Sequence, residues 1–439
     1  MKTLYKISLL LISVLLTCNY SWSQTAADIK MGEILNSGDL FKLREEYPAL
    51  KDSVSIGMLN LIAETQLGVG FNRLESAAIA MDSLLQFHQE ELGAETSLGI
   101  AGQRAMNLLN MGLYGPAGQA GEDLVNALKD AVPFESLYSY VFIGRMGKAL
   151  ADYPAPYVER PSHDVSVPMK CDTAGRGYHF HIPVEVNGIT KDYIFDTGCS
   201  FGNFVSEKYA EEAGLKIIAD SIPVSGISIG YVKLAVADSM KVGEIVYHNP
   251  VFMVAPPDKE VDSVFGFDGV LGYNFIRDIK EVIIDNENRK FVFPYRISDG
   301  KPNMYLVSNT PNIRTEYEGQ PYDMVFDSGN VKSDLGNKFA MMFPETLSGL
   351  EENSSSRGGF GGISQVKVVT LPEFEFSISG QPVQLQDTEV IKDADGGLLL
   401  SGSLGADFIL SFKRLTVNYE KMFVRGEKYK GSYKRLRSA

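Results

Sequence analysis

Two different spacings of apolar residues divide the chain. From about residue 25 to 152, apolar side chains recur every three or four positions, as they do along one face of a helix. Clear examples are Leu59, Ile62, Ala63 and Leu67, then Ala77, Ala80, Met81, Leu84 and Leu85. Glycines at 68–70, 93 and 112–115 interrupt these runs. The pattern predicts an α-helical domain over residues 25–152, with five or six helices packed as antiparallel hairpins.

The later part of the chain favours strands. At residues 178–183, for example, alternation places His179 and His181 on one face of a strand. Prolines at 154, 156 and 161 predict a linker over residues 153–166, between the helical part and the strand-rich part. We therefore expect a multi-domain protein, with an all-α domain followed by an all-β region.

The strand-rich region contains one pattern twice. In each copy a turn glycine stands eight residues before an aspartate, and a phenylalanine stands directly before it. The first copy continues as Asp-Thr-Gly at 196–198 and the second as Asp-Ser-Gly at 327–329. The first turn is Asn187-Gly188, and Asn-Gly between alternating apolar residues is a strong hairpin signal. Each aspartate is thus expected where a returning strand leaves its hairpin.

Each copy also has a matched second half. The segments 268–276 and 401–409 both contain Leu-Gly followed two residues later by Phe-Ile. Gly272 follows Asp196 by 76 residues, and Gly405 follows Asp327 by 78. Two matched anchors at nearly constant spacing indicate an internally duplicated region.

These residues resemble the aspartic peptidases of the pepsin-like and retropepsin-like kind. That family carries Asp-[Thr/Ser]-Gly and then a hydrophobic-hydrophobic-Gly segment in each of two lobes or subunits. The resemblance covers roughly residues 165–428 and implies an all-β bilobal domain, with lobes over 167–300 and 301–430. It also implies a catalytic pair, Asp196 and Asp327, supported by Thr197, Gly198, Ser328 and Gly329.

Two neighbouring carboxylates suit hydrolysis without a cofactor or a metal. They cannot both ionise easily, so they share one proton; aspartic peptidases are the usual illustration of this coupling. The ionised carboxylate acts as general base on water and the protonated one as general acid. The sequence thus predicts an aspartic endopeptidase. The alternative is an inactive peptide-binding module that keeps the cleft and uses the helical domain as its interaction surface.

The interval between the two halves of each copy is rich in glycine. It holds residues 224–231 in the first copy and 357–364 in the second. In the family this interval forms the flap, a hairpin that closes over substrate, and glycines permit its tight, mobile turn. The resemblance implies flap positions at Gly226, Gly230, Tyr231, Gly359 and Phe360, although a plain surface loop is the alternative reading.

Three residues depart from the family pattern. Cys199 and Asn330 follow the triplets, where pepsin-like enzymes tend to have Ser or Thr and retropepsin-like ones Ala. Ser403 stands where an apolar residue is usual. The side-chain amide of Asn330 is the largest concern, because it could hydrogen-bond Asp327 and change how the pair shares its proton.

The N-terminus suggests export. Residues 1–23 combine two lysines, an apolar core and a small-x-small site at 21–23, as a secretory signal peptide does. Cleavage is expected before Gln24, with lipidation at Cys18 as the alternative. The protein would then be periplasmic or secreted. The remaining cysteines, Cys171 and Cys199, could form a disulfide or stay as two buried thiols.

Charge and partners complete the expectations. The formal charge of −14 becomes −16 once the two leader lysines are removed, which argues against nucleic acid as a partner. We expect a peptide or protein substrate and a monomer, because the duplication supplies two lobes within one chain. The helical region loosely resembles tetratricopeptide-type repeats, so it could bind a protein partner or only support the protease. His179 and His181 lack further ligands of suitable spacing, so no metal is expected.

Overall fold

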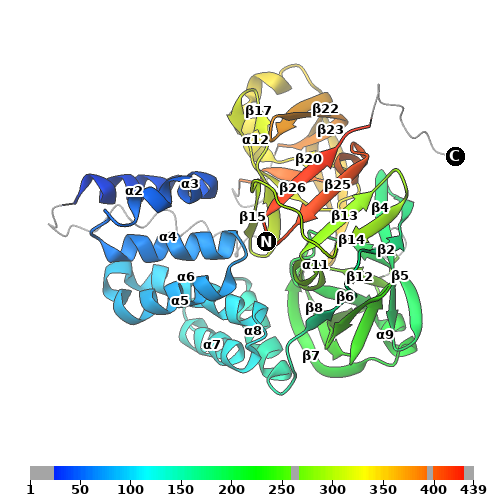
Figure 1. Cartoon of the computed structure of the whole chain (residues 1–439), viewed down its shortest axis with the longest axis horizontal. Coiled ribbons are helices and arrows are strands. Elements are labelled where there is room, and N and C mark those ends of the chain that lie inside the picture. The colour runs from blue at the N-terminus through cyan, green and yellow to red at the C-terminus, as the bar shows by residue number, and fades with distance from the viewer. Residues whose placement is uncertain (1–23, 259–265, 393–398, 430–439) are drawn as a thin grey trace.

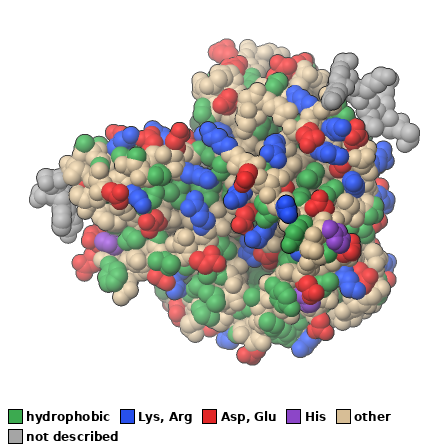
Figure 2. Space-filling model, viewed as in Figure 1, with side chains coloured by type: hydrophobic (Ala, Val, Ile, Leu, Met, Phe, Trp, Pro, Cys, Tyr) green, Lys and Arg blue, Asp and Glu red, His purple; other side chains and the backbone are tan. Residues whose placement is uncertain are grey.

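The computed structural model describes residues 24–258, 266–392 and 399–429 (Figure 1). The expected signal peptide, the cleavage site at 21–23 and Cys18 lie outside these residues. Among the described residues, no helix combines the length and apolarity needed to cross a membrane. Acidic and basic side chains are intermingled over the face shown in Figure 2.

The N-terminal part is helical, as predicted, with one helix more than expected. The described helices are α2 (Ala26–Ser37), α3 (Leu40–Leu50), α4 (Gly57–Gly70), α5 (Leu74–Phe87), α6 (Gln89–Asn110), α7 (Tyr114–Leu128) and α8 (Phe134–Leu150). The predicted breaks at Gly70 and Gly112 fall at helix ends. Gly93 instead bends α6 internally, because its φ of 74° is left-handed and glycine tolerates that conformation.

The β-rich part forms two large curled sheets, one in each lobe (Figure 1). The first-lobe sheet contains β1 (Tyr157–Glu159), β3 (Lys170–Ala174), β4 (Gly177–Val186), β5 (Ile189–Phe195), β6 (Asn203–Ser206), β7 (Lys216–Ser225), β8 (Ile229–Val236), β9 (Ser239–Val242), β10 (Ile245–His248), β11 (Val251–Ala255) and β12 (Gly269–Leu271). Helices α9 (Glu207–Glu212) and α11 (Tyr273–Ile279) belong to this lobe.

The second lobe repeats this plan. Its sheet contains β15 (Met304–Val307), β16 (Thr310–Ile313), β17 (Glu316–Tyr317), β18 (Gln320–Pro321), β19 (Met324–Phe326), β20 (Asp334–Leu335), β21 (Glu352–Gly359), β22 (Gly362–Ile378), β23 (Gln381–Ile391) and β24 (Gly402–Leu404). Its helices are α12 (Asn337–Met342), the 3-10 helix η2 (Pro344–Leu347) and α13 (Ala406–Leu410). The predicted all-α region followed by a bilobal β domain is therefore confirmed.

A third sheet joins the lobes. It runs in the order β2 (Val165–Pro168), β14 (Lys290–Phe293), β13 (Glu281–Asp285), β25 (Arg414–Asn418) and β26 (Phe423–Glu427). The junction is antiparallel pairing between β13 of the first half and β25 of the second, with Ile283 opposite Thr416. Backbone hydrogen bonds therefore cross directly from one lobe to the other.

The segment 153–166 differs from the expected linker. It contributes β1, which pairs with β10, and the start of β2, which pairs with β14. In β2, Val165 and Val167 are buried while their neighbours are exposed, so this stretch has the alternation that a half-buried strand requires. Pro154 and Pro156 precede β1, and Pro161 lies in the short turn between β1 and β2, so this segment is not a free connection.

The helices pack against both lobes. Helices α6–α8 share one apolar cluster with β7, β8 and β11 of the first lobe. Near the second lobe, Arg314 binds Asp323 beside it and also Asp39, the residue that caps α3. Asn110 at the end of α6 donates a 2.8 Å hydrogen bond to Asn309. The helical region is thus built into the protein and is not a separately packed appendage.

Candidate active site

Two tight hairpins deliver the paired aspartates. The turn between β4 and β5 has positive φ at Asn187 (51°) and Gly188 (81°), and the turn between β17 and β18 has it at Glu318 (49°) and Gly319 (74°). Positive φ at both central residues gives the twist that a two-residue hairpin needs. Asp196 directly follows β5, and the second aspartate directly follows β19, as the repeat predicts.

The glycine segments lie beside the aspartates. Strand β12 runs parallel to β5, and β24 runs parallel to β19. The backbone N–H of Asp196 donates to Leu271 O and that of Asp327 donates to Leu404 O, both at 3.0 Å. The matched halves of the sequence repeat therefore occupy matched positions in the two lobes.

Two buried hydroxyls lock the lobes together beneath the aspartates. Thr197 Oγ1 donates to Phe326 O at 2.9 Å and accepts from Ser328 N–H at 2.9 Å. Reciprocally, Ser328 Oγ donates to Phe195 O at 2.7 Å and accepts from Thr197 N–H at 2.9 Å. Neither residue has exposed surface. These four bonds fix the position of one triplet relative to the other.

Each carboxylate is held by its own loop. Asp196 Oδ1 accepts from the N–H groups of Gly198 (2.8 Å) and Cys199 (3.0 Å). Asp327 Oδ1 accepts from those of Gly329 (3.0 Å) and Asn330 (3.1 Å). In each aspartate the two backbone donors bind Oδ1 and not Oδ2, so both carboxylates are oriented in the same way.

The glycines of the triplets face the opposite carboxylate. A Cβ added at Gly198 would lie 2.4 Å from Asp327 Cγ, and one added at Gly329 would lie 2.4 Å from Asp196 Cγ. Only glycine admits such an approach. The two carboxyl groups also hydrogen-bond to each other, so the structure brings the predicted pair into contact.

The surroundings disfavour two negative charges in this pair. Burial is the main cause that raises the pKa of both aspartates. The pKa of Asp327 lies well above its ordinary value, because the charge of Asp196 adds to the effect of burial. Both residues nonetheless keep some exposed surface. The pair can therefore hold one shared proton at a site that solvent reaches.

Residues 182–275 match the family model for aspartyl protease. The matched segment runs from β4 through the first triplet and β12 into α11. A comparison with curated proteins finds no match.

Solved structures of low identity also match. A retropepsin-like aspartic protease from Rickettsia conorii is 18% identical, with 32% of this chain and 94% of that chain covered and a TM-score of 0.22. Basic 7S globulin from soybean is 10% identical, with 60% and 96% covered and a TM-score of 0.38. Conglutin gamma from lupine seeds is 10% identical, with 60% and 94% covered and a TM-score of 0.35.

The departures from the aspartyl protease pattern explain one another. The side-chain amide of Asn330 donates to Ser403 Oγ and not to Asp327, so the hydrogen bond considered from the sequence is absent. Ser403 in turn donates from both its N–H (3.1 Å) and its hydroxyl (3.2 Å) to Asp334 Oδ1. Only the backbone of Asn330 reaches the aspartate. An amide and a hydroxyl thus form a matched pair where the first lobe has Cys199 and Val270.

The two cysteines of the described chain are both free. Cys199 beside the first triplet contacts Gly202 O at 3.1 Å through its thiol. Burial raises the pKa of this thiol well above its usual value, so it stays protonated. Cys171 lies on β3. Of the two readings left open by the sequence, the structure supports packed thiols.

One residue that contacts the second triplet could not be found from the sequence. His179 on β4 lies 3.1 Å through Nε2 from the carbonyl of Gly329 in the second triplet. The two residues are 150 positions apart, so no local pattern links them. Among the described residues, no group of three or more His, Cys, Asp or Glu side chains could hold a metal.

The two glycine-rich intervals both form hairpins, and their tips meet. Ile227 N–H donates to Phe360 O at 2.7 Å, and Ser228 Oγ donates to Gly361 O at 2.7 Å. A Cβ at Gly226 would lie 2.2 Å from the carbonyl of Phe360, and one at Gly230 would lie 2.9 Å from its ring. These glycines therefore make room for Phe360.

The remaining positions that were predicted for the flap have different surroundings. A Cβ at Gly359 would meet Ile227 at an ordinary 3.5 Å. The Phe360 ring lies 5.9 Å from that of Phe204 in the first lobe. Tyr231 is 51% exposed. It offers much of its surface to solvent, whereas Phe360 packs across the lobe boundary.

Proposed function

We propose that this chain is an exported aspartic endopeptidase that hydrolyses peptide bonds with Asp196, Asp327 and one activated water. The observation that carries the proposal is the contact between two carboxyl groups from two lobes, each oriented by its own loop. Export rests on the leader-like composition of residues 1–23.

In the proposed reaction, Asp327 holds the proton at rest and Asp196 is ionised. Asp196 takes a proton from water as the water oxygen bonds to the peptide carbonyl carbon, and Asp327 gives its proton to the carbonyl oxygen. The resulting tetrahedral gem-diol collapses as its C–N bond breaks, Asp196 gives its proton to the leaving nitrogen, and Asp327 takes a proton from a hydroxyl of the gem-diol. The pair is then back in its starting state, with Asp327 protonated and Asp196 ionised, so no cofactor is consumed.

The two hairpins with touching tips would act as flaps over the substrate. Their separation would admit an extended peptide between the lobes, and their return would exclude water from the reacting groups. Phe360 and the facing glycines are the flap residues that we expect to contact substrate.

The test is digestion of a peptide library between pH 3 and 8 with mass-spectrometric detection. Asp196→Asn and Asp327→Asn should each reduce cleavage by several orders of magnitude, and the double variant should be little worse, because the pair acts as a unit. Asp192→Asn, four residues before the first triplet and exposed on β5, is the matched control and should retain activity.

The outcomes separate the two readings of the chain. A bell-shaped pH profile that disappears in both single variants supports the endopeptidase. Peptide binding without cleavage at any pH would favour the inactive binding module. If Asp327→Asn alone stayed active, the shared-proton mechanism would be wrong.

A further inference from the structure

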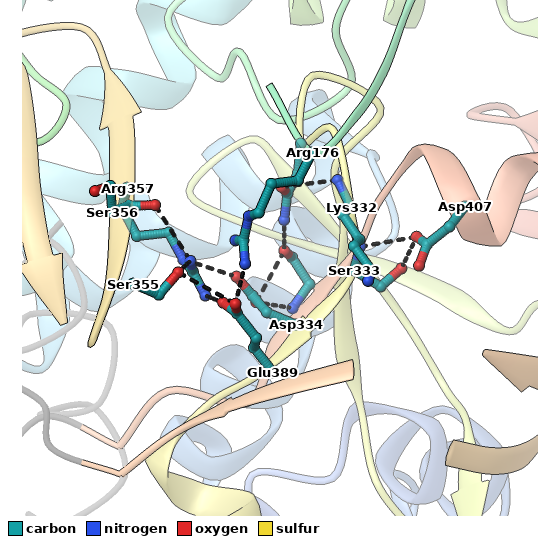
Figure 3. A network of polar contacts seen from close by, with 11 residues as sticks. Arg176, Lys332, Ser333, Asp334, Ser355, Ser356, Arg357, Glu389 and Asp407 are labelled. Carbon is teal, nitrogen blue, oxygen red and sulfur yellow. Dashed lines mark hydrogen bonds and ion pairs between the residues drawn. The ribbon is translucent and has the colours of Figure 1, made fainter. Parts of the chain in front are cut away.

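A cluster of charged side chains joins β20, β21 and β23 of the second lobe to a turn of the first lobe (Figure 3). Arg357 on β21 binds Glu389 on β23 at 2.8 Å and lies 3.5 Å from Asp334 on β20. Arg176, from the turn between β3 and β4 of the first lobe, binds the other oxygen of Glu389. The carboxylate side chains are only 14–15% exposed. Strands from one lobe and a turn from the other are thus joined by partly desolvated ion pairs.

This cluster is connected to Asp327 by direct hydrogen bonds. Asp334 accepts from Ser403, Ser403 accepts from the Asn330 side chain, and the Asn330 backbone donates to Asp327. Each link is a polar contact between partly or fully buried groups. Arg357 therefore supports the carboxylate that anchors the Asn330 loop.

The first lobe serves as an internal comparison. It reaches the same backbone geometry around Asp196 with Cys199 and Val270 where the second lobe has Asn330 and Ser403. Asn203 stands at the start of β6, where the second lobe has Asp334 at the start of β20. The loop after the aspartate therefore folds without a charged network in the first lobe. The hydrogen-bonded relay from Asp334 through Ser403 to Asn330 in the second lobe needs another explanation.

The two hairpins are also anchored differently. On β7 of the first lobe, residues 222–224 are buried, and Ile222 and Val224 belong to the apolar cluster of α6–α8. No residue of β21 is buried. Arg357 ties β21 to both Asp334 and Glu389 of the second lobe, three residues before the tip at Phe360, and Ser355 on the same strand also donates to Glu389 at 3.2 Å.

We propose that Arg357 is a positioning residue for Asp327, which couples the place of the second hairpin to the geometry of the aspartate pair. The proposal rests on the proposed function. When the second hairpin is seated, Arg357 holds Asp334, and Asp334 fixes Ser403 and Asn330 against Asp327. When the hairpin lifts, that support is withdrawn. The reacting pair is then complete only with the hairpin in place.

Loss of the Arg357 charge should change the titration of the Asp196–Asp327 pair. Asp334 and Glu389 would keep Arg176 as a nearby cation, while Asp407 faces the same region through Ser333. The more negative surroundings make ionisation of the pair harder and should move its titration to higher pH. When a reacting group is misplaced by a fraction of an ångström, the rate of the chemical step falls, while the affinity for substrate changes little.

The experiment compares Arg357→Met with Arg357→Lys in the full chain. The matched control is Lys367→Met, which removes an exposed cation from β22 of the same hairpin. Arg357→Met should lower kcat by about 10- to 100-fold with little change in KM. Arg357→Lys should recover much of the loss, and Lys367→Met should behave as the wild type. Ser403→Ala interrupts the relay without burying a charge, so it gives the same test if Arg357→Met fails to fold.

Two readouts do not depend on cleavage. The ¹³C carboxyl resonances of the pair, assigned by their loss in Asp196→Asn and Asp327→Asn, should titrate at higher pH in Arg357→Met. Trp22, the single tryptophan of the sequence, lies in the expected leader, so Phe360→Trp in the chain from Gln24 onward reports on the hairpin tip alone. Its fluorescence should be more easily quenched by acrylamide when Arg357 is replaced by methionine.

The outcomes distinguish the two proposals. If the wild type cleaves nothing but Arg357→Met still shifts the titration and frees the tip, the coupling stands and the endopeptidase proposal falls. If Arg357→Met and Lys367→Met are indistinguishable, the coupling is wrong. Equal losses in Arg357→Met and Arg357→Lys with an unchanged titration would likewise reduce Arg357 to a packing residue.

Discussion

Replacing Thr197 by valine tests whether buried hydroxyls hold the lobes together. Valine has a similar shape but removes the hydroxyl that donates to Phe326 O and accepts from Ser328 N–H, each at 2.9 Å. Thr197 and Ser328 are both fully buried, so bulk water does not readily replace these hydrogen bonds. Each lost bond to a buried group costs about 1–3 kcal/mol, and two bonds give a loss of about 2–6 kcal/mol.

The matched control is Thr388→Val on β23. Thr388 is also fully buried, but its hydroxyl has no hydrogen-bond partner among the described residues. Its removal should change stability by less than about 1 kcal/mol, or increase it, because no bond is broken.

Urea unfolding followed by circular dichroism compares the two variants. For a slope of about 3 kcal/mol per molar urea, Thr197→Val should lower the midpoint by about 0.7–2 M, and Thr388→Val should leave it nearly unchanged. Equal midpoints for the two variants would refute the reasoning. The hydrogen bonds of the Thr197 hydroxyl across the lobe boundary would then contribute nothing to stability. Thr197→Ser, which keeps the hydroxyl, should stay close to the wild type.

Three further variants test other parts of the site. Gly198→Ala places a methyl group 2.4 Å from the opposite carboxyl carbon and should reduce cleavage by at least about 100-fold, whereas Gly32→Ala in α2, with nothing within 4 Å, should be neutral. Asp327→Asn should raise the melting temperature at pH 7. Its folded pKa is raised by burial, so its stabilising contribution is complete below the ordinary value of 3.8 and lost as pH rises through the folded pKa. A calorimetric difference that did not shrink toward pH 3 would contradict this. Arg314→Met leaves the carboxylates of α3 and the second lobe facing each other, so hydrogen exchange in α3 should accelerate, and unchanged protection would show that apolar packing alone docks the helix.

Local patterns predicted the position of the aspartates well. Asn187-Gly188 and Gly319 fix the turns through left-handed backbone, and the strand that follows has a set length, so each aspartate emerges at the strand end. The duplication then implied that two such ends would meet. These are short-range features, in which the residues that determine the structure lie within about ten positions of it.

Long-range packing could not be predicted in the same way. The residues of β1 lie between prolines and pair with β10, which is some ninety residues later. The side chain of Asn330 donates to Ser403 and not to the nearby Asp327. Ser403 is held in place to accept this bond because its own hydroxyl donates to Asp334. Contacts of this kind follow from three-dimensional neighbours, and a single sequence carries no periodic signal for them.

The sheet shared by the lobes also constrains when the protein can fold. Its first strand, β2, ends at residue 168, while β25 and β26 occupy 414–427. Strand pairing over such separations is slow, because a long loop must close before the contacts stabilise it. During synthesis, the edge of β13 stays unpaired until almost the whole chain has emerged. A chain that completes its central sheet last remains incompletely folded for longer, and an unpaired strand edge is open to wrong partners until then.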